Sequence, residues 1–146
     1  MKKELLYIAI ILLLFYAIHG FPMDMETFTG ISTIDVNFYD TYFVLPSAYY
    51  WFITLSFAFS ITYLIRVLLT RFKNWYAKLI YLITNGLFIV SLVYVMQFLN
   101  VILKQFPDTT LASHKTFYTY FYVTTALLLF SVIMEVFVLF KMWKRF

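Results

Sequence analysis

The sequence contains no cysteine, and it has only 3 glycines and 3 prolines among its 146 residues. The absence of cysteine excludes disulfides, thiolate metal sites and cysteine nucleophiles. The scarcity of glycine and proline leaves long stretches in which a helix can run without interruption. Charge is scarce as well, because 12% of the residues are charged whereas 64% are hydrophobic, and the mean hydropathy is +0.86. This composition lies outside the range of soluble domains and indicates a protein that resides in a lipid bilayer.

Long apolar stretches occupy most of the chain. They cover about residues 5–21, 46–70, 79–103 and 117–140. A helix needs roughly 20 residues, with a range of about 17 to 25, to cross the hydrocarbon core. Gly20 and Pro22 mark the end of the first stretch. We therefore expect an all-α membrane protein with a single domain, residues 1–146, made of four transmembrane helices in an antiparallel bundle. Residues 22–45 form the outer segment between the first two helices.

The distribution of charge predicts the orientation of this bundle. Most of the 11 basic residues lie near the N-terminus, around the joint between the second and third stretches, or at the C-terminus. The outer segment 22–45 instead holds four acidic residues and no basic residue. The positive-inside rule then places both termini and the joint at residues 71–78 in the cytoplasm. We expect a multi-pass protein of the cytoplasmic (inner) membrane, and we interpret the net charge of +4 as a topology signal rather than as a sign of nucleic-acid binding.

The N-terminus allows one alternative. Lys2 and Lys3 followed by the apolar residues 5–15 resemble a secretory signal peptide. No small-x-small cleavage site follows, however, because the next residues are Ala17-Ile18-His19-Gly20. We therefore expect the first helix to be retained.

One segment of the outer loop resembles haem-copper oxidase subunit I. It reads Ile34-Asp35-Val36-Asn37-Phe38-Tyr39-Asp40-Thr41-Tyr42-Phe43-Val44. In that family the loop entering helix X reads Leu-Asp-x-x-Leu-His-Asp-Thr-Tyr-Phe-Val. Weaker similarities lie at Tyr76-Ala77-Lys78-Leu79 and at Gln97-Phe98-Leu99. The resemblance implies that the four helices are counterparts of helices IX to XII, the last four of the oxidase subunit. It also implies that residues 34–44 form an ordered plug over the helices.

The same comparison implies that the chemistry of the family is lost. The family continues Val-Ala-His-Phe-His-Tyr, and the two histidines bind the haem irons, whereas Ser47 and Tyr49 occupy those positions here. The His-Asp pair that helps to hold a magnesium ion in the family is replaced by Tyr39-Asp40. We therefore expect neither haem nor a resident metal, no cofactor and no enzymatic activity.

The remaining polar residues offer little chemistry of their own. Only two histidines are present, His19 and His114, and they lie at the ends of different predicted helices. A stable transition-metal site needs three or four converging ligands, so these two do not form one. Asp35 and Asp40 are either weak oxygen ligands for a cation or turn residues that accept hydrogen bonds from backbone amides. Thr41 and Tyr42 complete the set of candidate residues in this loop.

Two ionisable residues fall inside the predicted spans. Arg66 lies roughly 7 Å inward of Arg71, and Glu135 roughly 9 Å inward of Lys141, at the rise of about 1.5 Å per helical residue. Charges within a membrane usually face protein or water. Their similar depth predicts an ion pair between the second and fourth helices, with snorkelling of Arg66 to the interface as the alternative. Asn85 on the third helix is a candidate for hydrogen bonds between helices.

Two functions remain open from the sequence. The first is a non-catalytic membrane subunit or scaffold that resembles the last four helices of oxidase subunit I and docks on another membrane protein. The second is a homo-oligomeric pore or ion channel lined by Asn85 or Glu135. Burial of these residues within one bundle favours the first function, and a ring of them around a symmetry axis favours the second. The expected partners are the lipid bilayer and another membrane protein or further copies of this chain, but not nucleic acid.

Overall fold

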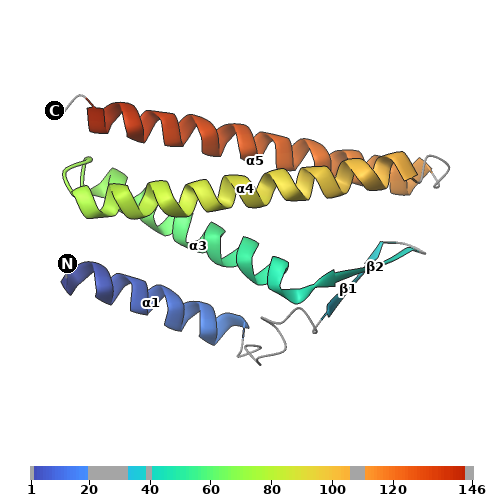
Figure 1. The fold of residues 1–146 in the computed structure, drawn as a ribbon, viewed down its shortest axis with the longest axis horizontal. Helices are drawn as coiled ribbons and strands as arrows, with labels where there is room; N and C mark the ends of the chain where they lie inside the picture. The colour runs from blue at the N-terminus through green and yellow to red at the C-terminus, as the bar shows by residue number, and fades with distance from the viewer. Residues whose placement is uncertain (1, 20–32, 39–40, 106–110, 144–146) are drawn as a thin grey trace.

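The computed structural model describes residues 2–19, 33–38, 41–105 and 111–143. These residues form four helices and a two-stranded hairpin (Figure 1). The elements are α1 (Lys2–His19), β1 (Thr33–Phe38), β2 (Thr41–Pro46), α3 (Ser47–Leu69), α4 (Trp75–Gln105) and α5 (Leu111–Trp143). The helical character of the fold is therefore as predicted, and the hairpin is an addition.

Three of the helices are long and apolar enough to cross a membrane. The spans are Ser47–Leu69, Trp75–Lys104 and Lys115–Trp143. Within α1 the apolar stretch Glu4–Ala17 is shorter than these spans. The helices α4 and α5 extend beyond the predicted ranges at both ends, because the prediction followed the apolar residues alone. A helix continues through flanking polar residues as long as its backbone hydrogen bonds are made.

Helix α4 packs against both α3 and α5, and α1 lies against α3. One stripe of α3 is buried, and it consists of Ser47, Ser56, Ser60, Tyr63 and Val67. The spacing of three and four residues from Ser56 onward is that of one helical face. Small residues on such a face allow neighbouring helices to approach closely. The N-terminal end of α1, the α3–α4 turn and the C-terminal end of α5 all lie at one end of the molecule (Figure 1).

The turn between α3 and α4 closes by a Schellman motif. The Phe72 amide donates to the Val67 carbonyl at 3.0 Å, and the Arg71 amide donates to the Leu68 carbonyl at 2.9 Å. Arg71 and Phe72 have φ angles of 48° and 60°, in the left-handed region that favours glycine. The Phe72 ring packs edge-on against Phe137 of α5, with ring centroids 5.5 Å apart. This contact ties the turn to the last helix.

The segment before α3 forms an antiparallel hairpin. Strands β1 and β2 pair from Thr33 opposite Pro46 to Phe38 opposite Thr41. Pro46 ends the second strand and precedes the first residue of α3, a position where its fixed φ of −56° is compatible with the start of a helix. The hairpin extends beyond the N-terminal end of α3 and contacts chiefly itself and that helix (Figure 1). The ordered plug of residues 34–44 over the helices stays a prediction.

Candidate functional site

A polar cluster, the Glu4 cluster, joins α1 to the α3–α4 turn. It consists of Glu4, Tyr7, Arg66 and Asn74. Arg66 Nη2 and Asn74 Nδ2 each donate to Glu4 Oε1, both at 2.7 Å. The Arg66 guanidinium carbon also lies 3.6 Å from the centroid of the Tyr7 ring, which is a cation–π contact. Two donors from different parts of the chain thus meet at a single carboxylate oxygen, and Tyr7 packs on one of them.

The predicted ion pair between Arg66 and Glu135 is wrong. Arg66 pairs with Glu4, and the two side chains are only 16% and 8% exposed. The physical reason is the arrangement of the helices: α1 lies beside α3 at the level of Arg66, and Glu135 on α5 is bonded to α4 instead. The sequence predicts a similar membrane depth for Arg66 and Glu135, but it does not predict which helices lie side by side.

Asn74 has two roles in the Glu4 cluster. Its Oδ1 accepts a hydrogen bond from the Ala77 amide at 3.3 Å, which caps the N-terminus of α4. Its Nδ2 donates to Glu4. The residue that caps α4 therefore also binds α1, so the position of α1 depends on the conformation of the turn.

The Glu4 cluster is not fully hydrogen-bonded within the described part of the chain. Glu4 Oε2 and the Nε and Nη1 atoms of Arg66 are buried without a partner there. An unsatisfied buried polar group typically costs about 1–3 kcal/mol, and more when it is charged. The attachment of α1 to the other helices therefore combines strong contacts at one oxygen with unfavourable burial at the neighbouring atoms.

A second cluster, the Asn85 cluster, lies between α3, α4 and α5. Asn85 is 2% exposed. Its Oδ1 accepts from Ser60 Oγ at 2.9 Å, and its Nδ2 donates to the Ser131 carbonyl at 3.1 Å and to Glu135 Oε2 at 2.9 Å. One amide thus links all three long helices. Asn85 and Glu135, both predicted as candidates, are brought together, and Ser60 and Ser131 are added to them.

An apolar and aromatic layer separates the two clusters along the helices. Tyr63, Val67, Ala77, Tyr81 and Val138 are all 0% exposed and belong to one packed core. Tyr63 lies between Ser60 and Arg66 on α3, and Tyr81 lies between Asn74 and Asn85 on α4. The hydroxyl groups of both tyrosines are buried without a partner among the described residues. The two polar clusters are therefore divided by side chains packed without water-accessible surface.

Three of the candidate residues of the outer segment lie on the strands of the hairpin. Asp35 lies on β1 opposite Val44 and is exposed. Tyr42 and Thr41 lie on β2, opposite Asn37 and Phe38. Tyr39 and Asp40 lie outside the described residues. The cation site predicted from Asp35 and Asp40 stays a prediction for that reason.

The positions that the oxidase resemblance assigns to haem ligands differ in their surroundings. Ser47 begins α3 and is buried, whereas Tyr49 is 60% exposed. The side chains of His19 and His114 lie outside those that the structure describes. Among the described residues, no three histidine, cysteine or acidic side chains lie close enough together to bind a metal ion.

Comparison with known families settles nothing further. No family model, curated protein or solved structure matches this chain. The resemblance to oxidase subunit I stays a prediction based on residues 34–44.

The sequence analysis did not identify Glu4 or Asn74 as site residues. Glu4 follows two lysines and was indistinguishable from an ordinary interfacial charge. Asn74 precedes the apolar run of α4, and an asparagine at such a place is a recognised helix N-cap signal. That signal predicts the cap, but it does not predict the bond from the same side chain to α1.

Proposed function

We propose that this chain is a non-catalytic subunit or scaffold of the cytoplasmic (inner) membrane that docks on another membrane protein. In this proposal all four helices span the bilayer as an antiparallel bundle, with α1 as the shortest span and both termini in the cytoplasm. The grouping of basic residues at the termini and at the α3–α4 turn supports this orientation. The position of these three regions at one end of the molecule is compatible with it (Figure 1).

The Asn85 cluster is the observation that carries the proposal. A pore requires polar side chains that face a water-filled path. Here the side-chain amide of Asn85 forms hydrogen bonds to Ser60, Ser131 and Glu135 of the same chain. The packed layer around Tyr63 and Tyr81 lies between this cluster and the Glu4 cluster. The hydrogen bonds of Asn85 therefore stabilise the helix contacts, and the largely apolar outward faces of the helices are left for lipid and for a partner.

Photo-cross-linking in native membranes tests this function. A photoreactive residue is placed at an exposed position of α5, Phe130 or Phe140, and in a control at Val138, which is fully buried. We expect the exposed positions to yield a covalent product with one other polypeptide, identified by mass, and the buried position to yield none. Products with lipid alone at every exposed position of α5 and α1 would contradict the proposal.

The homo-oligomeric pore is the second candidate, and one observation favours it. Glu135 is partly exposed, and Gln97 and Asn100 of α4 are exposed, so some polar groups do face outward. A pore built from these residues predicts cross-links only between copies of this chain, together with ion flux in vesicles. That pair of results would favour the pore over the scaffold.

A further inference from the structure

Glu135 is hydrogen-bonded on one side only. Its Oε2 atom accepts from Asn85, whereas no donor among the described residues reaches its Oε1 atom. The side chain is partly exposed and lies within the apolar span Lys115–Trp143, six residues before Lys141. In hydrocarbon no water supplies the missing donor, so a carboxyl oxygen at this place requires a donor from elsewhere.

A glycine lies next to this oxygen. Gly86 of α4 lies beside it, and a Cβ atom at Gly86 would be 3.7 Å from Glu135 Oε1. Gly86 is partly exposed, and a glycine in a transmembrane helix permits a second helix to approach closely. No side chain from position 86 therefore covers Oε1.

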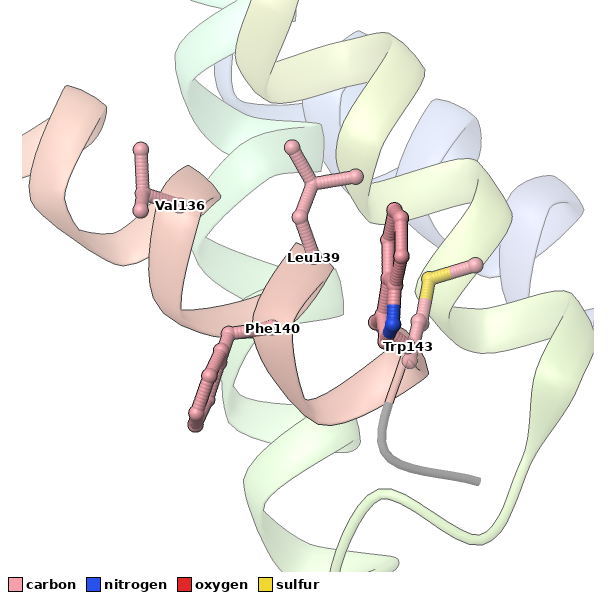
Figure 2. Close-up of a pocket in the computed structure, with 5 residues that line it drawn as sticks. Val136, Leu139, Phe140 and Trp143 are labelled. Atoms are coloured by element: carbon pink, nitrogen blue, oxygen red, sulfur yellow. The ribbon is translucent and has the colours of Figure 1, made fainter. Parts of the chain in front are cut away.

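An apolar groove follows Glu135 along α5. Its volume is about 730 Å³, and it is lined by Val136, Leu139, Phe140, Met142 and Trp143. Leu139 and Met142 follow Glu135 by four and seven residues, so they lie on the same stripe of the helix. Figure 2 shows Leu139 and Trp143 side by side on one side of α5, with Phe140 directed away from them. An elongated apolar object in this groove would pass close to Glu135.

The charge of Glu135 determines which occupant fits. A lipid acyl chain fills the groove but has no donor for Oε1. A second copy of this chain in the same orientation has no exposed basic residue at this depth in its described part. The exposed basic residues there lie toward the ends of the helices, and they are Arg71, Lys73, Lys104, Lys115 and Lys141. A helix of a different protein can carry the matching charge.

We propose that the Glu135 groove, formed by Gly86, Glu135 and the lining residues of α5, binds a transmembrane helix of another protein that places a lysine or arginine beside Glu135. The inference rests on the proposed function, since it names the docking face of the subunit and the chemistry of its partner. Intramembrane charges are usually paired between helices, and an acidic side chain is complementary to a basic one.

Model peptides in lipid vesicles test the charge pairing with the full chain. One peptide is a leucine–alanine helix of about 20 residues with a single lysine at the depth of Glu135, and the matched peptide has leucine there. Energy transfer between labels on peptide and protein measures association. We expect the lysine peptide to bind about tenfold more tightly than the leucine peptide. We expect Glu135→Gln, which keeps an acceptor for Asn85, to remove this preference.

A larger side chain at position 86 provides a second test. Gly86→Ile fills the space beside Oε1, and we expect it to weaken binding of the lysine peptide. Ala126→Ile introduces the same side chain at an exposed site on the opposite side of α5 and should leave binding unchanged. Equal binding of the two peptides, absence of binding by both, or a lysine preference that survives Glu135→Gln would each overturn the inference.

Failure of this inference can be distinguished from failure of the proposed function. If Glu135→Gln leaves the cross-linked product with another polypeptide at full yield, the inference fails and the proposed function stands. If the unsubstituted protein yields no such product, the proposed function fails whatever the peptides do. A loss of that product on Glu135→Gln, with the circular dichroism spectrum unchanged, is the result that we expect.

Discussion

The two oxygens of Glu4 have opposite surroundings, and this asymmetry gives a prediction for single residues. Oε1 accepts from Arg66 and Asn74, whereas Oε2 is buried without a partner in the described chain. Glu4→Gln removes the charge that holds Arg66. We expect it to lower the free energy of unfolding in detergent by about 1.5–3 kcal/mol, the range for a hydrogen bond to a charged group. Chemical denaturation followed by circular dichroism measures this change.

A double-mutant cycle identifies the partner of Arg66. The combination of Glu4→Gln with Arg66→Gln should cost less than the sum of the single substitutions, because each one already removes the shared interaction. The combination of Glu135→Gln with Arg66→Gln should be additive within about 0.5 kcal/mol, since these residues share no contact. Additivity for Glu4 and coupling for Glu135 would refute the described arrangement.

Asn85 gives a second prediction at this scale. Asn85→Leu preserves the approximate volume but removes three hydrogen bonds, including the only donor to Glu135 Oε2 among the described residues. We expect a loss of about 1–3 kcal/mol, because a buried acceptor then lacks a partner. Asn100→Leu is the matched control, since Asn100 lies on the same helix but is exposed. In thermal unfolding, we expect a lower midpoint for Asn85→Leu and an unchanged midpoint for Asn100→Leu.

At the scale of elements, the α3–α4 turn places two consecutive non-glycine residues in the left-handed region. Arg71 occupies the position that glycine favours in a Schellman motif. We expect Arg71→Gly to raise the free energy of unfolding by about 0.5–1 kcal/mol through relief of this strain. Phe72→Gly relieves similar strain but removes the ring that packs on Phe137, so it should destabilise instead. Opposite shifts of the unfolding midpoint in the two variants would confirm the motif.

The elements also show what sequence patterns determine here. Apolar length located the three long helices, because a backbone in hydrocarbon must satisfy its own hydrogen bonds. It located the ends of α3 within one residue but not those of α4 and α5, since polar residues such as Lys104 and Lys115 continue these helices past the apolar runs. It also did not predict that Arg66 meets Glu4. The ion-pair partner of Arg66 depends on which helix lies beside α3. The similar membrane depth of Arg66 and Glu135 did not show that α1, and not α5, is that helix at this level.

At the scale of the whole molecule, the charge distribution predicts the orientation in the membrane. We expect a reporter fused after Phe146 and one inserted near Lys73 to report a cytoplasmic position, and one near Glu26 to report an external position. The reason is the concentration of basic residues at the termini and the α3–α4 turn, and their absence from residues 22–45. An external C-terminus, with the reporter near Glu26 external and the reporter near Lys73 cytoplasmic, would be incompatible with four spans.

The bond between Glu4 and Asn74 has a consequence for the order of events during synthesis. The residues that hold α1 lie 62 and 70 positions after Glu4 in the chain. At a translation rate of about 5–20 residues per second, the residues between the end of α1 at His19 and Asn74 take roughly 3–11 s to make. Until then the hydrogen bond from Asn74 to Glu4 cannot form. The docking site of α1 is thus completed later than the helix itself, when the α3–α4 turn closes.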